Sequence, residues 1–287
     1  MSVLMYPEAG YSFDGRATVM PDSLGRLCKM MDVPVVTVIT SGAFLRDPLY
    51  NNLKIRKVNV TAAVKCLLTR EEVRNTPAEE ISALIQKDFA FDGFAAQTKK
   101  KTEIKEDFRA DGLHRILYKC PHCKTEGQTV GKGTHLSCEN CGKIYFMDTF
   151  GKICCENGKA VFSHIPDWYD WQRNCVKEEI EKGEYSLDVP VDIYIVRDAK
   201  ALYSVGEGRL THGTKGFSLM GCDGKLNYFQ PSESLYTLNA DFNWYEIGDV
   251  IGIGDKEMLY YCFPKEKIPV AKARLATEEI YKSLKEL

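Results

Sequence analysis

The sequence lacks the features of several large classes of protein. It contains no run of about twenty apolar residues, the length that a membrane-spanning helix requires, so we expect any membrane contact to be peripheral. It also lacks an excess of one charge: the formal net charge is -2 over 287 residues, without the cationic field that favours nucleic-acid binding. Its first residues do not form a secretory signal pattern, and its 11 cysteines show no disulfide framework, so we expect a reducing, cytoplasmic location.

The composition is that of a globular protein with more than one folding unit. Hydrophobic residues make up 44% of the chain and charged residues 27%, proportions that are ordinary for such proteins. A chain of 287 residues is long enough for two domains with separate cores and a third, smaller unit. The motifs described below predict three units over residues 1–110, 111–155 and 156–287.

Four cysteines form the strongest chemical pattern in the chain. Cys120 and Cys123 are followed, after fourteen residues, by Cys138 and Cys141. Two residues between paired cysteines let both sulfurs face one cation from a tight turn, and two such turns supply the tetrahedral ligands that Zn²⁺ prefers. We therefore predict a zinc ribbon over 111–155. Because four thiolates leave no open position for water or substrate, we expect this zinc to be structural.

Alternatives to this site remain open from the sequence. The four cysteines could form two disulfides or remain free thiols, although a reducing compartment disfavours disulfides. His122 and His135 lie inside the ribbon and could replace a cysteine, and the adjacent thiols of Cys154 and Cys155 could join a metal site. We expect the histidines to be solvated and the two thiols to pack as small apolar groups, because four sulfurs already complete the site.

The start of the chain alternates between strand and helix patterns. The apolar residues 2–6 and the mostly β-branched run 33–39 predict two strands, and apolar residues at helical spacing predict a helix over 22–31. The order strand, helix, strand predicts a parallel βαβ unit. A strand that is apolar along its whole length is typically covered on both faces, so we expect this of 33–39.

The segment that precedes the cysteines is predicted to hold a helix and a basic linker. Thr76, followed by a proline and then by Glu79, is a capping pattern that predicts a helix over 77–89. Four lysines then lie within 99–105. We expect them to form a solvated linker, and attraction to anionic lipid headgroups is the alternative.

The last part of the chain is predicted to be a β-rich domain that follows a linker helix. An amphipathic helix over 270–287 is expected to end it. Roughly seven antiparallel strands closed by a helix resemble, in element order, domains of the pleckstrin-homology (PH) or GRAM type. The glycines at 252 and 254 predict a turn over 252–255. Three aromatic residues of the linker helix are expected to pack in the core: Trp168, Tyr169 and Trp171. The candidate strands are 193–196, 201–205, 208–211, 216–219, 226–229, 235–238 and 258–263.

Two short blocks near the start of the chain resemble an enzyme family. Tyr6-Pro7-Glu8-Ala9-Gly10-Tyr11-Ser12 and Val33-Pro34-Val35-Val36-Thr37-Val38 are similar to the third and fourth blocks of glycerol-phosphate and lysophosphatidate acyltransferases. Those blocks usually read F-P-E-G-T-R-S and V-P-V-V-P-V, and the match covers about the first hundred residues. The resemblance implies a partial acyltransferase α/β domain over 1–110. It also implies acyl transfer from acyl-CoA or acyl carrier protein to the hydroxyl of a lysophospholipid-like acceptor.

The resemblance further implies which residues bind substrate. In the family, the third block lies beside the glycerol-phosphate site and the fourth helps to shape the acyl channel. Here Ala9 replaces the glycine of the third block and Tyr11 replaces its phosphate-pairing arginine, so we expect Arg16 to take over that contact. The substrate residues implied are Glu8, Ala9, Gly10, Tyr11, Arg16, Val33 and Pro34.

The catalytic pair of that family is missing from the sequence. Its histidine, oriented by an aspartate five positions later, takes the proton of the attacking hydroxyl. None of the 5 histidines precedes Glu8 or has an aspartate at that offset. We therefore expect the chain to be the later part of a longer protein and to be inactive by itself. His164 could orient on Asp167, a pairing that we expect to be structural.

A non-enzymatic role is the main alternative. The ribbon and the β-rich domain could bind a protein or a membrane surface, with the acyltransferase-like part serving as a scaffold. Nucleic-acid binding ranks third, because the cysteine turns hold few basic residues and no stacking aromatic residues.

Overall fold

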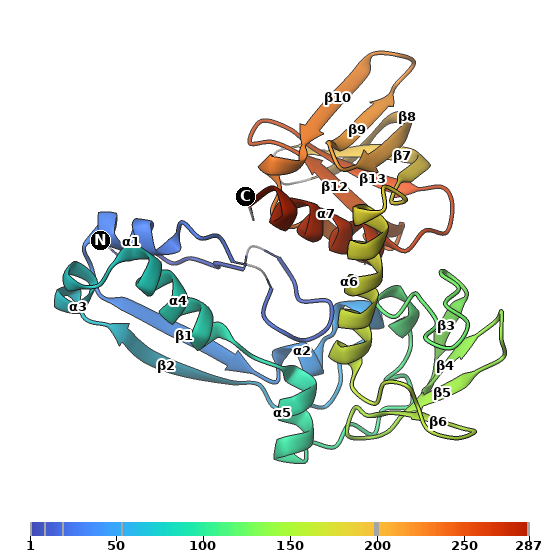
Figure 1. Cartoon of the computed structure of the whole chain (residues 1–287), viewed down its shortest axis with the longest axis horizontal. Coiled ribbons are helices and arrows are strands. Elements are labelled where there is room, and N and C mark those ends of the chain that lie inside the picture. Colours follow the sequence, from blue (N-terminus) through green and yellow to red (C-terminus); the bar gives the residue numbers. More distant parts are fainter. Residues whose placement is uncertain (1, 9, 19, 53, 198–200, 286–287) are drawn as a thin grey trace.

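The structure is a computed structural model that describes residues 2–8, 10–18, 20–52, 54–197 and 201–285. It combines helices with three antiparallel sheets of 2, 4 and 7 strands, so the fold is mixed α/β and rich in β-structure. The three sheets follow one another along the chain, and α6 (Ile165–Glu181) runs from the four-stranded sheet to the seven-stranded one (Figure 1).

The N-terminal unit is a two-stranded sheet with helices on one face. Strands β1 (Val35–Ser41) and β2 (Thr61–Leu68) pair with each other, and α1 (Leu24–Met31) packs against α4 (Ala78–Phe89) above them (Figure 1). The short helix α3 (Arg70–Asn75) joins β2 to α4. The core of this unit is small and consists of Met20, Leu24, Cys28, Leu68, Val73, Ile81 and Ile85.

The predicted parallel βαβ unit is wrong. Strand β1 pairs antiparallel with β2, and the chain returns between them through two short turns of helix, α2 (Ala43–Arg46) and η1 (Leu49–Asn51). A parallel pair would need a long crossover that packs back onto the sheet. The predicted first strand forms no strand in the structure, because residues 2–6 pair with no neighbour and expose their apolar side chains, including Leu4 at 77% and Tyr6 at 80%.

The two faces of this sheet have an unusual distribution of polarity. On the face that the helices cover, the hydroxyl of Thr37 and the ammonium of Lys65 both contact Asp88 of α4. The opposite face is open and carries no charge, so the expectation that 33–39 would be covered on both faces is also wrong. This open face consists of Val36, Val38, Thr40, Ala62, Val64 and Cys66.

The predicted helix over 77–89 is confirmed, but its capping differs. Pro77 is the N-cap of α4 and no side chain caps it, because Thr76 instead ends α3, where its amide donates to the carbonyl of Glu72 at 2.9 Å. The capping box lies one helix earlier: the Thr69 side chain accepts from the Glu72 amide while the Glu72 carboxylate accepts from the Thr69 amide. The same side-chain chemistry therefore starts α3 rather than α4.

The ribbon is a meander of four short antiparallel strands. Helix α5 (Gly93–Lys100) and the turn η2 (Leu113–Arg115) precede it. Its strands are β3 (Thr129–Lys132), β4 (His135–Cys138), β5 (Ile144–Met147) and β6 (Ile153–Cys155), paired in that order. Leu136 and Tyr145 turn inward and join a core that continues through α6 into the C-terminal sheet.

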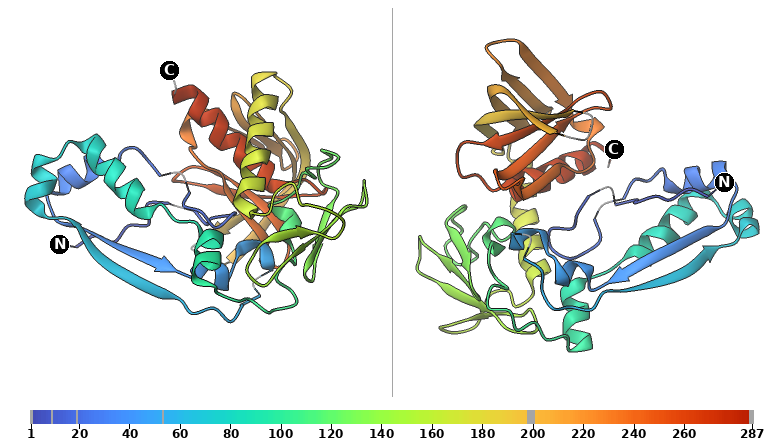
Figure 2. Two further views of the ribbon diagram at one scale, coloured as in Figure 1. Left: turned by 60° about the horizontal axis from the view of Figure 1, so that its bottom comes forward. Right: turned by 180° about the vertical axis from the view of Figure 1, so that it is seen from behind.

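The linker helix α6 connects the ribbon to the C-terminal domain. Trp168 and Tyr169 are buried and Trp171 is partly buried in the shared core, which confirms the expected packing of the three aromatic residues. Helix α6 also packs against the last helix, α7 (Val270–Lys285), as Figure 2 shows. The predicted C-terminal helix is confirmed over its described residues, which end at 285.

The C-terminal domain is a seven-stranded antiparallel sheet with a helix on one side. Its strands follow the order β10-β9-β8-β7-β13-β12-β11, and α7 packs against β11 and β12. The turn η3 (Ser232–Ser234) lies between β10 and β11. The strands are β7 (Leu187–Arg197), β8 (Ala201–Gly213), β9 (Gly216–Gly221), β10 (Leu226–Pro231), β11 (Asn239–Trp244), β12 (Gly248–Gly254) and β13 (Leu259–Pro264).

Three local predictions in this domain are wrong. The separate strands predicted over 201–205 and 208–211 form one strand, β8. Residues 252–255 were predicted to form a turn, yet Gly252 and Gly254 belong to β12, which places Ile251 and Ile253 in the core. The strand predicted over 235–238 lies instead at 239–244. At β11 and β12, burial of apolar side chains between the sheet and α7 outweighs the turn and strand preferences of the local sequence.

A buried histidine is expected to make the C-terminal domain less stable in acid. The ring of His212 stacks on Phe217 with centroids 3.7 Å apart, its Nδ1 lies 2.9 Å from the Tyr185 hydroxyl, and burial lowers its pKa to about 3. The unfolded chain binds this proton near pH 6.5 and the folded chain does not. The free energy of unfolding should therefore decrease by up to about 1.4 kcal/mol per pH unit as the pH falls from 6.5 towards 3.

Urea unfolding measured between pH 7 and pH 4 tests this expectation. The variant His212→Asn keeps an acceptor for Tyr185 but does not titrate, so its free energy of unfolding should depend less steeply on pH, by about one proton. An equal slope in the variant and the natural protein would show that His212 is not the group responsible.

Candidate metal centre

Two turns of similar geometry hold the four cysteines. In the first turn the Lys124 amide donates to the Cys120 carbonyl at 2.8 Å, and in the second the Gly142 amide donates to the Cys138 carbonyl at 2.9 Å. Lys124 and Gly142 both have left-handed backbone conformations, with φ of 61° and 69°. Glycine suits position 142 because it adopts this conformation without a steric cost.

The four sulfurs lie at the corners of a compact cluster. The Sγ atoms of Cys120 and Cys141 are 3.8 Å apart, those of Cys123 and Cys138 are 3.7 Å apart, and all four lie within 4.8 Å of one another. A tetrahedron with metal–sulfur bonds of about 2.3 Å has edges of about 3.8 Å, which matches these separations. A disulfide needs about 2.05 Å, so the pairs are not covalently bonded. The cluster can therefore hold one metal ion.

Burial disfavours the thiolate at two of the four cysteines. Burial raises the pKa of Cys120 to about 12 and also raises the pKa of Cys138, whereas hydrogen bonding by Thr125 lowers the pKa of Cys123 to about 5. A metal ion binds cysteine as the thiolate, so its charge must overcome the desolvation of the two buried sulfurs. Metal binding should accordingly release protons and weaken as the pH falls.

The alternative ligands lie outside this cluster. His122 is exposed, and His135 is exposed on β4, where its Nδ1 lies 3.0 Å from the hydroxyl of Thr134. Cys155 donates to the carbonyl of Asn157 at 3.5 Å. Within the described ranges of the chain, the four predicted cysteines are the one group with metal-binding geometry.

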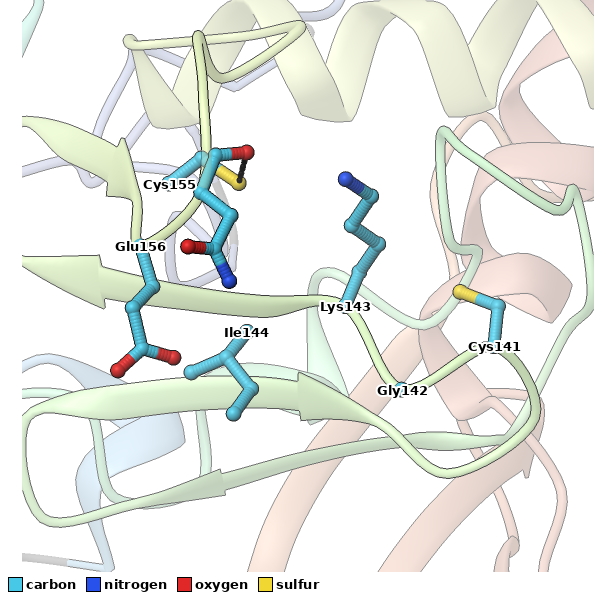
Figure 3. A pocket seen from close by; sticks show the side chains of 7 residues that line it. Cys141, Gly142, Lys143, Ile144, Cys155 and Glu156 are labelled. Atoms are coloured by element: carbon cyan, nitrogen blue, oxygen red, sulfur yellow. Dashed lines mark hydrogen bonds between the residues drawn. The ribbon is translucent and has the colours of Figure 1, made fainter.

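A shallow pocket lies beside the second cysteine turn. Figure 3 shows Cys141 and Lys143 on one side of it and Cys155 and Glu156 on the other, and its volume is about 240 Å³. Its lining mixes one cation, one anion and two thiols on short strands and turns of the ribbon. The residues that line this pocket do not form an arrangement of acid, base and nucleophile beside an oxyanion site, so we do not treat the pocket as a candidate active site.

The loop that holds the predicted substrate residues is docked on α6 and α7. The Glu8 carboxylate accepts from the Thr18 amide at 2.8 Å, so it braces the two ends of this loop. The Tyr11 carbonyl accepts from Arg274 of α7 at 2.8 Å, while the Tyr11 side chain is 72% exposed. Gly10 is exposed, and Ala9 lies outside the described residues.

Arg16 is engaged by two carboxylates. Its guanidinium donates to both oxygens of Asp170 on α6 at 2.6 Å each and to Asp14 at 2.7 Å. A planar guanidinium offers five donors, and this bidentate arrangement occupies the fork that would otherwise suit a phosphate. In this structure Arg16 therefore anchors the loop to α6.

The second resemblance block lies on a different element from the first. Val33 and Pro34 precede β1, whose start lies beside α3 at the end of the N-terminal unit that points away from α6 (Figure 1). Arg16, by contrast, contacts α6 directly. The structure thus brings Glu8, Gly10, Tyr11 and Arg16 into one loop but does not bring Val33 and Pro34 to it.

A histidine–aspartate pair exists that the sequence did not predict. His164, the N-cap residue of α6, pairs through Nε2 with Asp92 at 2.8 Å, and this hydrogen bond raises the pKa of His164. Asp92 also caps α5 by accepting from the Ala95 amide. The predicted partner was Asp167, and no local signal indicates Asp92, because 72 residues separate the pair. The pair joins two helix N-termini, which is a structural role.

The described part of the chain contains no helix that is both long and apolar enough to cross a bilayer. A scan against models of known protein families finds no match to this sequence, and a search of curated proteins also finds none.

Proposed function

We propose that the four cysteines bind one structural Zn²⁺ ion. The support is the sulfur geometry: four thiols from two turns, with edges that fit a tetrahedral four-sulfur site. Zinc of this kind contributes folding energy and leaves no position for a substrate. Elemental analysis of the protein purified under reducing conditions should find about one zinc per chain, and a metal-free protein with a folded ribbon would contradict the proposal.

For the N-terminal unit, we propose the acceptor-binding part of an acyltransferase of the glycerol-phosphate type. The observation that carries this proposal is the open, uncharged face of β1 and β2. A two-stranded sheet is marginal on its own, and a wholly uncharged face favours contact with another layer of structure. Strand β1 is also the strand that contains most of the fourth resemblance block, so the resemblance and the open face fall on the same element.

In this proposal the catalytic histidine and aspartate belong to a further segment that packs on the open face. The chain as given supplies Glu8 and the loop around it, and contacts with α6 and α7 hold that loop in place. In this reaction the acceptor hydroxyl would attack the thioester carbonyl while the supplied histidine takes the hydroxyl proton. The C–S bond would then break, and the histidine would return the proton to the sulfur that leaves.

Transfer of a radiolabelled acyl group to lysophosphatidate or glycerol phosphate tests this function. The chain alone should show no transfer from acyl-CoA or acyl carrier protein. A longer chain in which an H-x4-D pair precedes Glu8 should show transfer, and Glu8→Ala in that longer chain should reduce it, whereas Glu103→Ala should not. Failure of the longer chain with every acceptor and both donors would count against acyl transfer.

A second candidate function is a non-enzymatic binding module, and the C-terminal domain favours it. We propose that this domain has a PH-type or GRAM-type fold, supported by its strand order and by the helix that follows the last strand. Its outer surface exposes Met220 at 57% and Phe229 at 54% on the neighbouring strands β9 and β10. Exposed apolar side chains of this size often mark a contact with a protein or a membrane surface.

Vesicle co-sedimentation separates the two candidates. If the β-rich domain binds membranes, the natural chain should sediment with vesicles of mixed neutral and anionic lipid, and Phe229→Asp should release it. Asn239→Asp is the control, because Asn239 is exposed on β11, at the other edge of the same sheet. Sedimentation that is absent, or that is equal in both variants, would remove membrane binding by this surface.

A further inference from the structure

Lys119, which directly precedes the first cysteine, is held on both sides of its backbone by α6. Its amide donates to the Gln172 side chain at 2.9 Å, and its carbonyl accepts from the indole Nε1 of Trp168 at 2.9 Å. Gln172 also donates to the carbonyl of Ile116 at 2.7 Å. Both side chains of α6 are fully buried, so these hydrogen bonds fix the path of the chain into Cys120.

The side chain of Lys119 belongs to a closed ring of four charges. Lys119 contacts Glu126 at 3.0 Å and Glu179 at 3.3 Å, and Lys272 contacts the same two carboxylates at 2.7 Å each. Lys119 and Glu126 flank the first cysteine turn, Glu179 belongs to α6 and Lys272 belongs to α7. The ring therefore joins three parts of the molecule, and its charges alternate in sign.

The four charged side chains of the ring are partly shielded from solvent, so we expect their ion pairs to contribute to stability. The exposed fraction of its four side chains ranges from 12% for Lys119 to 26% for Glu126. Isolated pairs on a surface contribute little, but a network of partly buried charges is screened less and its members depend on one another. Loss of the first cysteine turn would remove one cation and one anion from the ring, and would leave Glu179 and Lys272 as a single pair.

We infer that this contact couples metal binding to the docking of α7 on α6 and the ribbon, an inference that rests on the proposed zinc site. Helix α6 and the charge ring position the first cysteine turn for the metal, and the metal in turn holds two corners of the ring in place. Coupling between two sites is reciprocal, so a change in the ring must alter metal affinity by the same factor by which metal alters the ring.

Nuclear magnetic resonance of the full chain gives a readout at the contact itself. The Trp168 indole proton bonds the residue next to Cys120, so removal of zinc with a chelator should shift its resonance. The indole of Trp244 stacks on Tyr261 in the distant sheet, with centroids 4.2 Å apart, and should shift less. Amides of α7 near Lys272 should exchange with deuterium faster in the metal-free protein than in the zinc form.

A substitution in the ring tests the reverse direction. Lys272→Met keeps the length of the side chain but removes its charge, and it should raise the dissociation constant for zinc about fivefold. Lys282→Met is the matched control on the same helix, because Lys282 pairs with Glu279 outside the ring. The control should bind zinc as the natural protein does, measured by competition with a chromogenic chelator.

The possible outcomes are distinguishable. Zinc bound at one per chain, with an unchanged Trp168 resonance, unchanged exchange of α7 and equal zinc affinities for the two lysine variants, would overturn the coupling while leaving the zinc site intact. Failure of the natural chain to bind zinc would overturn the zinc site itself, and the coupling with it.

Discussion

Cys138→Ser is expected to lose its zinc and to unfold the ribbon. Cys138 is buried at the end of β4, and its sulfur lies 3.7 Å from that of Cys123. A serine hydroxyl does not ionise as a thiol does, so the site would keep three thiolates around an incomplete shell. Structural zinc contributes roughly 10–16 kcal/mol of apparent binding free energy, comparable to the whole stability of a domain. Metal content and the dispersion of ribbon amide resonances measure the effect.

Cys66→Ser provides the matched control for that variant. Cys66 is exposed on β2 and lies outside the metal cluster, so its replacement should leave the zinc content and the ribbon resonances unchanged. Retention of one zinc per chain by Cys138→Ser, with a folded ribbon, would show that the Cys138 sulfur is not a required ligand and would contradict a site closed by four sulfurs.

Glu278→Ala is expected to destabilise the protein by about 3–5 kcal/mol. Glu278 is buried on α7, where it contacts Arg173 at 2.7 Å, Arg274 at 3.2 Å and the hydroxyl of Thr237 at 2.8 Å. Burial pushes the pKa of Glu278 up, but Arg173 and Arg274 push it down further, so it lies below its usual value. Removal of the carboxylate would leave Arg274 buried without its carboxylate partner, and Arg173 would keep only Glu279.

Urea unfolding at neutral pH measures this loss, and Glu178→Ala is the control. Glu178 lies on α6, is 65% exposed and pairs with Lys182 at 3.4 Å, so its replacement should change the free energy of unfolding by no more than about 0.5 kcal/mol. Because the pKa of Glu278 is lowered, its contribution is present above the pKa of the unfolded carboxyl and is lost as the pH falls through its folded value. Equal stabilities of the two variants would show that the arginines find other partners.

The parts of the fold that depend on local sequence could be predicted. The metal cluster follows from cysteine spacing within 22 residues, and helices α4 and α7 follow from the spacing of their apolar residues. Each of these features is determined by side chains that are close along the chain. The four-cysteine cluster is accordingly the part of the predicted site that the structure assembles as expected.

The pairing of strands could not be predicted in the same way. An apolar strand such as β1 accepts either a parallel or an antiparallel neighbour, and the choice depends on how the chain returns. Here the return through α2 and η1 places β2 beside β1 in antiparallel register. The burial of β12 has a similar cause, since α7 covers this strand from 16 residues further along the chain.

The contacts that hold the predicted substrate loop could not be predicted from sequence patterns either. Arg16 could be identified as a cation near the third block, but its partner Asp170 lies 154 residues away. The same is true of Arg274, which binds the carbonyl of Tyr11 over a separation of 263 residues. Residues so far apart along the chain form no motif that sequence reading can detect, because only the packing of α6 and α7 brings them together.

X-ray absorption spectroscopy at the zinc edge tests the metal assignment most directly. The proposed zinc site predicts a first shell of four sulfur atoms at about 2.3 Å, with no nitrogen or oxygen ligand. A shell that contains histidine nitrogen or water oxygen in place of a sulfur, or a protein without zinc, would contradict the assignment of Cys120, Cys123, Cys138 and Cys141 as a closed structural site.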